Sequence, residues 1–147
     1  MRIQWHSGHA VGFPSIDAQQ QELVRRVNKL GDAIRAGNVE EVGARLDLVR
    51  GAAAVQFAEE EARLRAAGDR SLVRHRHEHL RLIEDLDGLA EALEARGIAA
   101  VREARLASWL PAWIDVHAAR THRELAAVAG RVPAPSLPVR VAADKLP

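Results

Sequence analysis

The segment Ser15–Ile34, "SIDAQQQELVRRVNKLGDAI", decides the fold, because its apolar residues follow the spacing of a helix that faces a core. These residues are Ile16, Leu23, Val27, Leu30 and Ile34. Their repeat places them on one face of an amphipathic helix. Gln20 occupies the one position of this face that is not apolar. A buried amide costs about 1–3 kcal/mol unless a partner binds it, so the segment predicts a polar neighbour inside the core.

The composition is that of one soluble domain of 147 residues, with 48% hydrophobic and 28% charged residues. The net charge of +1 predicts neither nucleic acid nor membrane as a partner. The absence of cysteine excludes disulfides, thiolate metal sites and iron–sulfur clusters. We expect no haem and no nucleotide cofactor. The N-terminus lacks the apolar core of a signal peptide, which predicts a cytoplasmic protein, either a monomer or a weak homo-oligomer.

Helical patterns alternate with short breaks along most of the chain. Residues 1–14 read as a non-helical arm, and Ser15 is a suitable N-cap for a helix that ends near Arg35. Further helices are predicted over 39–67, over 69–95 with Asp69 as the cap, and over 99–129. Four such helices with short connections predict an all-α, up-down-up-down four-helix bundle over residues 1–130. The proline-rich segment 131–147 is predicted to be an extended tail.

Each predicted helix carries a polar or unusually large residue in its core-facing stripe. These residues are Gln20 in the first helix, Gln56 and Glu60 in the second, His75 and His79 in the third, and Trp113 with Val116 or His117 in the fourth. An antiparallel bundle brings all of them to the same half of the molecule. The sequence therefore predicts a buried polar layer, and Pro111 should kink the fourth helix and help to turn His117 inward.

Glu60 suggests that this layer binds a metal ion. A buried carboxylate is unfavourable unless it is paired, and no lysine or arginine shares its stripe. His75 and His79 lie one turn apart on one helix face, and two histidines with one carboxylate form a common site for divalent metals. The alternative is a hydrogen-bond network in which His75 donates to Glu60. We expect His6 and His9 to be exposed on the arm, the alternative being that they reach the mouth of the bundle or bind metal adventitiously. We expect His77 to lie on the surface.

Four motifs over about residues 3–122 resemble the hemerythrin family in its short bacterial form. They are "IQW…VGFPSIDAQ…L…NKL", "QFAEEEARL", "HRHEH" and "WLPAWI", in the family's order and spacing. The resemblance implies a four-helix bundle with a carboxylate-bridged di-iron site that binds O2 through five histidines, a glutamate and an aspartate.

The resemblance also implies that this ligand set is incomplete here. The retained ligands are Glu60, His75 and His79. The positions of the lost ligands hold Gln20, Gln56, Trp113 and Ala118. One iron would keep most of its ligands, whereas the other would lose both of its own histidines and a bridging carboxylate.

Three functions are therefore open. The first is a site for one divalent ion, iron or zinc, bound by four residues: Glu60, His75, His79 and, as a fourth ligand, His117. The ion would also bind a small ligand such as O2 or water, for sensing, storage or redox chemistry. In that site, Gln20, Gln56 and Trp113 would line the pocket. The second is a metal-free interaction or regulatory module, and the third, less favoured, is a mononuclear metal enzyme.

Overall fold

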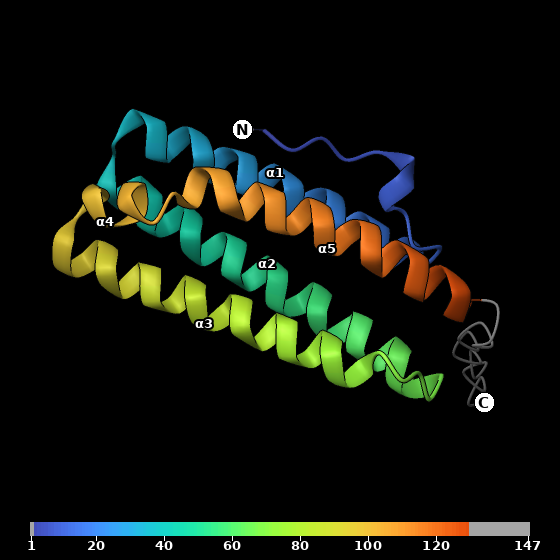
Figure 1. Cartoon of the computed structure of the whole chain (residues 1–147). Coiled ribbons are helices and arrows are strands. Elements are labelled where there is room, and N and C mark those ends of the chain that lie inside the picture. The colour runs from blue at the N-terminus through green and yellow to red at the C-terminus, as the bar shows by residue number, and fades with distance from the viewer. Residues whose placement is uncertain (1, 130–147) are drawn as a thin grey trace, which may run out of the picture.

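Four long antiparallel helices form the molecule, as Figure 1 shows for the computed structural model, which describes residues 2–129. The long helices are α1 (Pro14–Ala36), α2 (Val39–Ala66), α3 (Leu72–Arg96) and α5 (Leu106–Ala129), with short helices η1 (Ser7–His9) and α4 (Ile98–Glu103). The predicted all-α, up-down-up-down four-helix bundle is confirmed. The predicted tail, 131–147, lies outside the described residues.

The first two long helices begin and end where local chemistry favours it. Pro14 opens α1 at a position where its missing N–H costs nothing, so Ser15 is not the N-cap that the sequence predicted. Its hydroxyl donates instead to Glu59. Gly37 ends α1 with a left-handed φ of 80°. Asn38 caps α2 by accepting a hydrogen bond of 3.0 Å from the Glu41 amide.

Two further predicted helix boundaries are wrong. Asp69 accepts a hydrogen bond from the Ser71 amide, which builds a turn ahead of α3 rather than capping that helix directly. The predicted fourth helix is divided into α4 and α5 between Glu103 and Leu106. Arg105 causes this break with a φ of 56°, a left-handed conformation that no continuous helix contains.

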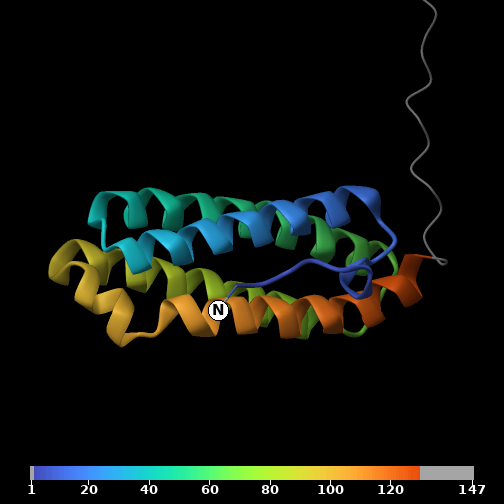
Figure 2. The same cartoon turned by 90° about the horizontal axis from the view of Figure 1, so that it is seen from above.

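The N-terminal arm lies along α1 and α5 (Figures 1 and 2). Asn28 of α1 holds it by accepting from the Ile3 amide and donating to the Ile3 carbonyl. Trp5 packs against the core, and its indole N–H donates to Gln20 of α1 at 3.0 Å. The arm is therefore a docked part of the domain.

The core consists of two apolar clusters with a polar layer between them. The larger cluster includes Leu23, Val27, Leu46, Leu86 and Leu110. The smaller cluster comprises Val11, Phe13, Ile16, Leu64, Leu125 and Val128. Each long helix contributes its buried polar residues between these clusters, so apolar packing closes the layer on both sides.

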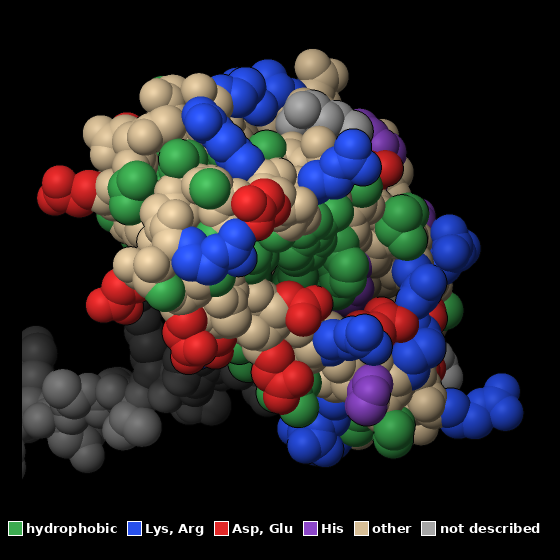
Figure 3. Space-filling model, turned by 60° about the vertical axis from the view of Figure 1, so that its left-hand side comes forward, with side chains coloured by type: hydrophobic (Ala, Val, Ile, Leu, Met, Phe, Trp, Pro, Cys, Tyr) green, Lys and Arg blue, Asp and Glu red, His purple; other side chains and the backbone are tan. Residues whose placement is uncertain are grey.

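Charged side chains of both signs are interspersed on the outer surface (Figure 3). Several form ion pairs within or between helices, such as Arg26 with Glu22 and Arg120 with Glu78. This agrees with the near-zero net charge of the chain.

Candidate metal centre

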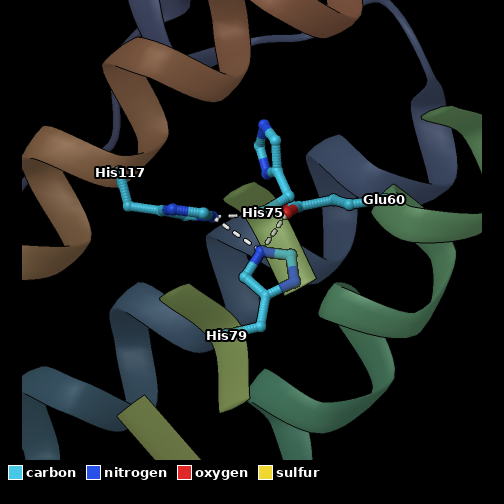
Figure 4. Close-up of side chains that lie close together, drawn as sticks. All are labelled: Glu60, His75, His79 and His117. Carbon is cyan, nitrogen blue, oxygen red and sulfur yellow. Dashed lines mark hydrogen bonds and ion pairs between the residues drawn. The ribbon is translucent and has the colours of Figure 1, made fainter. Parts of the chain in front are cut away.

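Four buried side chains from three helices converge in the polar layer (Figure 4). They are Glu60 of α2, His75 and His79 of α3, and His117 of α5, with exposed fractions of 0%, 0%, 2% and 5%. Each offers one nitrogen or oxygen atom, and these four atoms all lie within 4.8 Å of one another. The structure thus brings together all four residues that the sequence proposed as metal ligands.

Three of the atoms form a compact triangle. Glu60 Oε2 lies 3.1 Å from His79 Nε2 and 3.3 Å from His117 Nε2. The two histidine nitrogens are themselves 3.3 Å apart. The other oxygen of Glu60, Oε1, accepts a hydrogen bond of 2.8 Å from Gln56. The carboxylate is therefore held on one side by an amide and faces the imidazoles with the other.

A carboxylate lies on the outer side of each histidine. His79 Nδ1 bonds to Glu61 at 2.9 Å, and His75 Nε2 bonds to Glu124. His117 Nδ1 lies 3.8 Å from Glu78, an ion-pair distance rather than a hydrogen bond. Such outer partners fix the orientation and tautomer of histidines that bind metals. Because Nε2 of His75 is engaged, its unpartnered Nδ1 is the nitrogen left for the cluster.

Glu60 and His117 each stabilise the charged form of the other. Burial disfavours ionised Glu60, but hydrogen bonds to His117 and His79 outweigh that cost and hold its pKa well below the usual range. Burial likewise opposes a charged His117, yet Glu60 and Glu78 raise its pKa to about 9. Among residues 2–129, Glu60 pairs with no lysine or arginine, so the cation that faces it in the absence of metal is the His117 imidazolium.

His75 and Glu78 favour opposite kinds of charge state, neutral for His75 and anionic for Glu78. Burial lowers the pKa of His75 against the opposing effect of Glu124, so this ring favours its neutral form, which can bind a metal ion. The neighbouring His117 imidazole, assisted by Arg74 and Arg120, holds the pKa of Glu78 at about 2. Glu78 therefore stays an anion beside the cluster at every physiological pH.

The three residues that the sequence predicted to line the pocket occupy different environments. Gln20 is buried, but its oxygen accepts the Trp5 N–H and faces the arm. Gln56 directly contacts Glu60. The half-buried Trp113 stacks on the His117 ring with centroids 4.7 Å apart, and Phe57 stacks on His79 at 3.9 Å. Two aromatic rings thus form walls of the cluster.

The helix phase of α5 selects His117 over Val116 as the inward residue. Val116 is 60% exposed, whereas His117 is buried and lies 3.2 Å from the Thr121 hydroxyl. Sequence reasoning missed Thr121 and the three outer carboxylates. A search at intervals of three, four and seven around the inward histidines would have found Glu78, Thr121 and Glu124, because those intervals share a helix face.

The prediction that both arm histidines are exposed is wrong for His9. His6 is exposed, but His9 is only 2% exposed because η1 packs it against α5. His9 Nε2 bonds to Asp115 at 2.9 Å. His77 is exposed, as predicted.

Three of the four atoms of the cluster have the spacing of ligands around one metal ion. A divalent ion with bonds of about 2.0–2.2 Å to nitrogen and oxygen holds neighbouring ligand atoms about 3.0–3.5 Å apart. The separations of 3.1 Å, 3.3 Å and 3.3 Å within the triangle fall in this range. The donor set of three imidazoles and one carboxylate suits zinc or iron.

A bundle of four antiparallel helices with inward histidines and a glutamate at mid-layer has a hemerythrin-like fold. Two solved structures show the likeness directly: a crystal structure of a hemerythrin mutant with leucine replaced by tyrosine, and that of a mutant with leucine replaced by phenylalanine. In both comparisons the TM-score is 0.67 and the identity 22%, over 84% of this chain and 97% of the other. At this identity the likeness concerns the fold.

The sequence comparisons add no family or relative. No protein-family model matches the chain, and no curated protein matches it either. Within residues 2–129, no helix has the length and apolar character needed to cross a membrane.

Proposed function

We propose that this protein binds a single divalent metal ion, iron or zinc, through Glu60, His75, His79 and His117. A small ligand such as O2 or water would complete the coordination, and the normal di-iron O2 site would be absent. The observation that supports this most directly is the convergence of three imidazoles on one buried carboxylate, each imidazole with an anion on its outer side.

The geometry favours an ion over a hydrogen-bond network. His79 and His117 direct nitrogens 3.3 Å apart at the same oxygen of Glu60. Without an ion, two N–H groups in that arrangement would repel each other, so one nitrogen must carry a lone pair that accepts from the other. Around a cation, by contrast, two lone pairs and a carboxylate are all attracted to the same centre. A single ion pair with Glu60 would also require only one histidine, and the cluster contains three.

The residues around the cluster support one ion rather than two. The side chains at the positions where the resemblance implies the other iron offer no imidazole or carboxylate: Gln20, Gln56 and Ala118. The oxygen of Gln20 is engaged by Trp5. Gln56 donates its nitrogen to Glu60, and its oxygen, which has no hydrogen-bond partner, is a neutral amide ligand that binds iron only weakly. The family's fourth-helix histidine falls on Trp113 in this chain. His117, one turn further along the helix, would supply the fourth ligand instead.

The roles of the individual groups follow from their contacts. Glu60 supplies the negative charge, and Gln56 orients it. Glu61, Glu78 and Glu124 orient the three imidazoles and increase their basicity. The ion would supply Lewis-acid and ligand-binding chemistry when bound. Phe57 and Trp113 restrict access, which favours a small ligand and a binding role over catalysis on a large substrate.

A metal-free module is the second candidate, and a specific observation favours it. The raised pKa of His117 means that this residue is an imidazolium at neutral pH and neutralises Glu60 without an inorganic ion. The protein would then use the bundle as an interaction or regulatory domain.

Elemental analysis of freshly purified protein, with melting curves before and after chelation, distinguishes the two candidates. We expect His79→Ala to lose one tightly bound ion per chain while its helical circular dichroism stays close to that of the parent. The matched control is His77→Ala, which removes an exposed histidine two residues away on the same helix.

The proposal fails if His79→Ala retains as much metal as His77→Ala. It also fails if the parent takes up no ion after growth with added iron and zinc and melts at the same temperature with and without chelator. That second result would favour the metal-free module.

A further inference from the structure

We propose a second metal site, distinct from the cluster in the polar layer, in which His6, His9 and Asp115 bind Zn2+ where the arm meets α5. The three residues offer one ligand atom each, all within 4.8 Å of one another. They share no residue with the inner cluster, so this site does not depend on the proposed function.

The local fold brings these residues together from distant parts of the chain. His6 is the N-cap of η1 and accepts a hydrogen bond of 3.1 Å from the Gly8 amide. The η1 turn places the His6 and His9 rings 3.8 Å apart. Asp115 comes from α5, and His122 of the same helix bonds to the Ala10 carbonyl just after η1. Two contacts with α5, one through His9 and one through the Ala10 carbonyl, thus hold the η1 turn in place.

His9 contacts both of the other residues of the proposed site. Its side chain is 2% exposed, and Nε2 bonds to Asp115 at 2.9 Å. Its other nitrogen, Nδ1, is buried without any hydrogen-bond partner. A buried imidazole with an unmatched nitrogen is unfavourable, and nothing in an ordinary arm contact requires a histidine there. Since Nε2 is the nitrogen that faces Asp115, it is the His9 atom that an ion shared with Asp115 would bind, in place of that hydrogen bond.

The remaining two ligands make the site accessible from solvent. Asp115 has 58% of its side chain exposed, and His6 is also exposed. The His6 ring can release the Gly8 amide to water and turn its free nitrogen towards an ion. Two imidazoles and one carboxylate with a remaining position for water form a normal ligand set for zinc.

Zinc at this site would connect the first residues of the chain to α5 by metal–ligand bonds. The segment held in this way contains Trp5, which donates to Gln20 of the polar layer. Metal binding at the arm would therefore stiffen the segment that covers one side of the inner cluster.

Zinc titration of the full chain, stripped by chelation, tests the second site. We expect His6→Ala and Asp115→Asn each to bind one Zn2+ fewer than the parent, or to bind it at least about tenfold more weakly. Asp115→Asn keeps an oxygen that can accept from His9, so the arm stays docked. The control is again His77→Ala, which should bind as much zinc as the parent.

Amide hydrogen exchange gives a second readout that a structural role of these residues would not move. Zinc should slow exchange over residues 3–13 in the parent and in His79→Ala, but not in His6→Ala. Equal zinc binding by the parent, His6→Ala and Asp115→Asn overturns the second site, as does loss of the ion in His77→Ala. Failure of the inner site is seen separately, as unchanged metal content in His79→Ala.

Discussion

Raising the pH should destabilise the metal-free protein through His117. This residue has a pKa of about 9 in the folded chain and an ordinary value of 6.5, because Glu60 and Glu78 stabilise its charged form. A raised pKa contributes stability that is complete below the unfolded value and is lost as the pH passes through the folded value. The folded state binds the extra proton, so the loss occurs as the pH rises.

The magnitude follows from the size of the pKa difference. The difference between about 9 and 6.5 corresponds to about 3 kcal/mol at about 1.4 kcal/mol per pKa unit. Between about pH 6 and about pH 9.5, roughly 3 kcal/mol of this should disappear. For a domain of this size, that lowers the melting temperature by about 10 °C.

Chemical denaturation of chelator-treated protein at several pH values measures this effect. Glu60→Gln removes one of the two carboxylates that raise the pKa of His117, so the unfolding free energy of this variant should fall much less steeply over the same pH range, with the contribution of Glu78 remaining. Glu59→Gln is the matched control, because Glu59 bonds to Ser15 and Gln19 away from the cluster and its loss should preserve the slope. The reasoning is refuted if the parent shows no slope, or if Glu60→Gln shows the parental slope.

Three further changes test other parts of the structure. Trp5→Phe removes the donor to Gln20 and should destabilise the protein by about 1–3 kcal/mol in urea denaturation. The double variant with Gln20→Leu should recover part of this loss, and an unchanged stability of Trp5→Phe would contradict the hydrogen bond. Arg105→Gly should raise the unfolding free energy by about 0.5–1 kcal/mol, since glycine adopts a φ of 56° without strain, and Arg105→Ala should give no such gain. Trp113→Ala opens the wall over His117, so a chelator should remove the inner ion several-fold faster in stopped-flow measurements. An unchanged rate of removal would place the entry route elsewhere.

Hydrophobic spacing was enough to predict the bundle and most of its core. Leu23, Val27, Leu46 and Leu86 are buried as their three–four rhythm requires. The break at Arg105 was not predictable, because its surroundings contain no glycine or proline at that point.

The candidate site was predictable where a single helix face contains the signal. Glu60, His75 and His79 interrupt apolar stripes, and that interruption identified them. The choice between Val116 and His117 depends on the rotation of α5 about its axis, which the pattern alone left open. The burial of His9 escaped prediction because the arm has no periodicity, and its environment depends on α5, more than a hundred residues away.

The stacking of the Trp113 indole on His117, with rings 4.7 Å apart and only 13° from parallel, gives the protein an optical probe of its own centre. Indole emission is quenched by an adjacent imidazolium and by many bound transition metals, and it recovers beside a neutral ring. Loss of a proton or arrival of an ion at this position would therefore register as a change in intrinsic fluorescence, without any attached label.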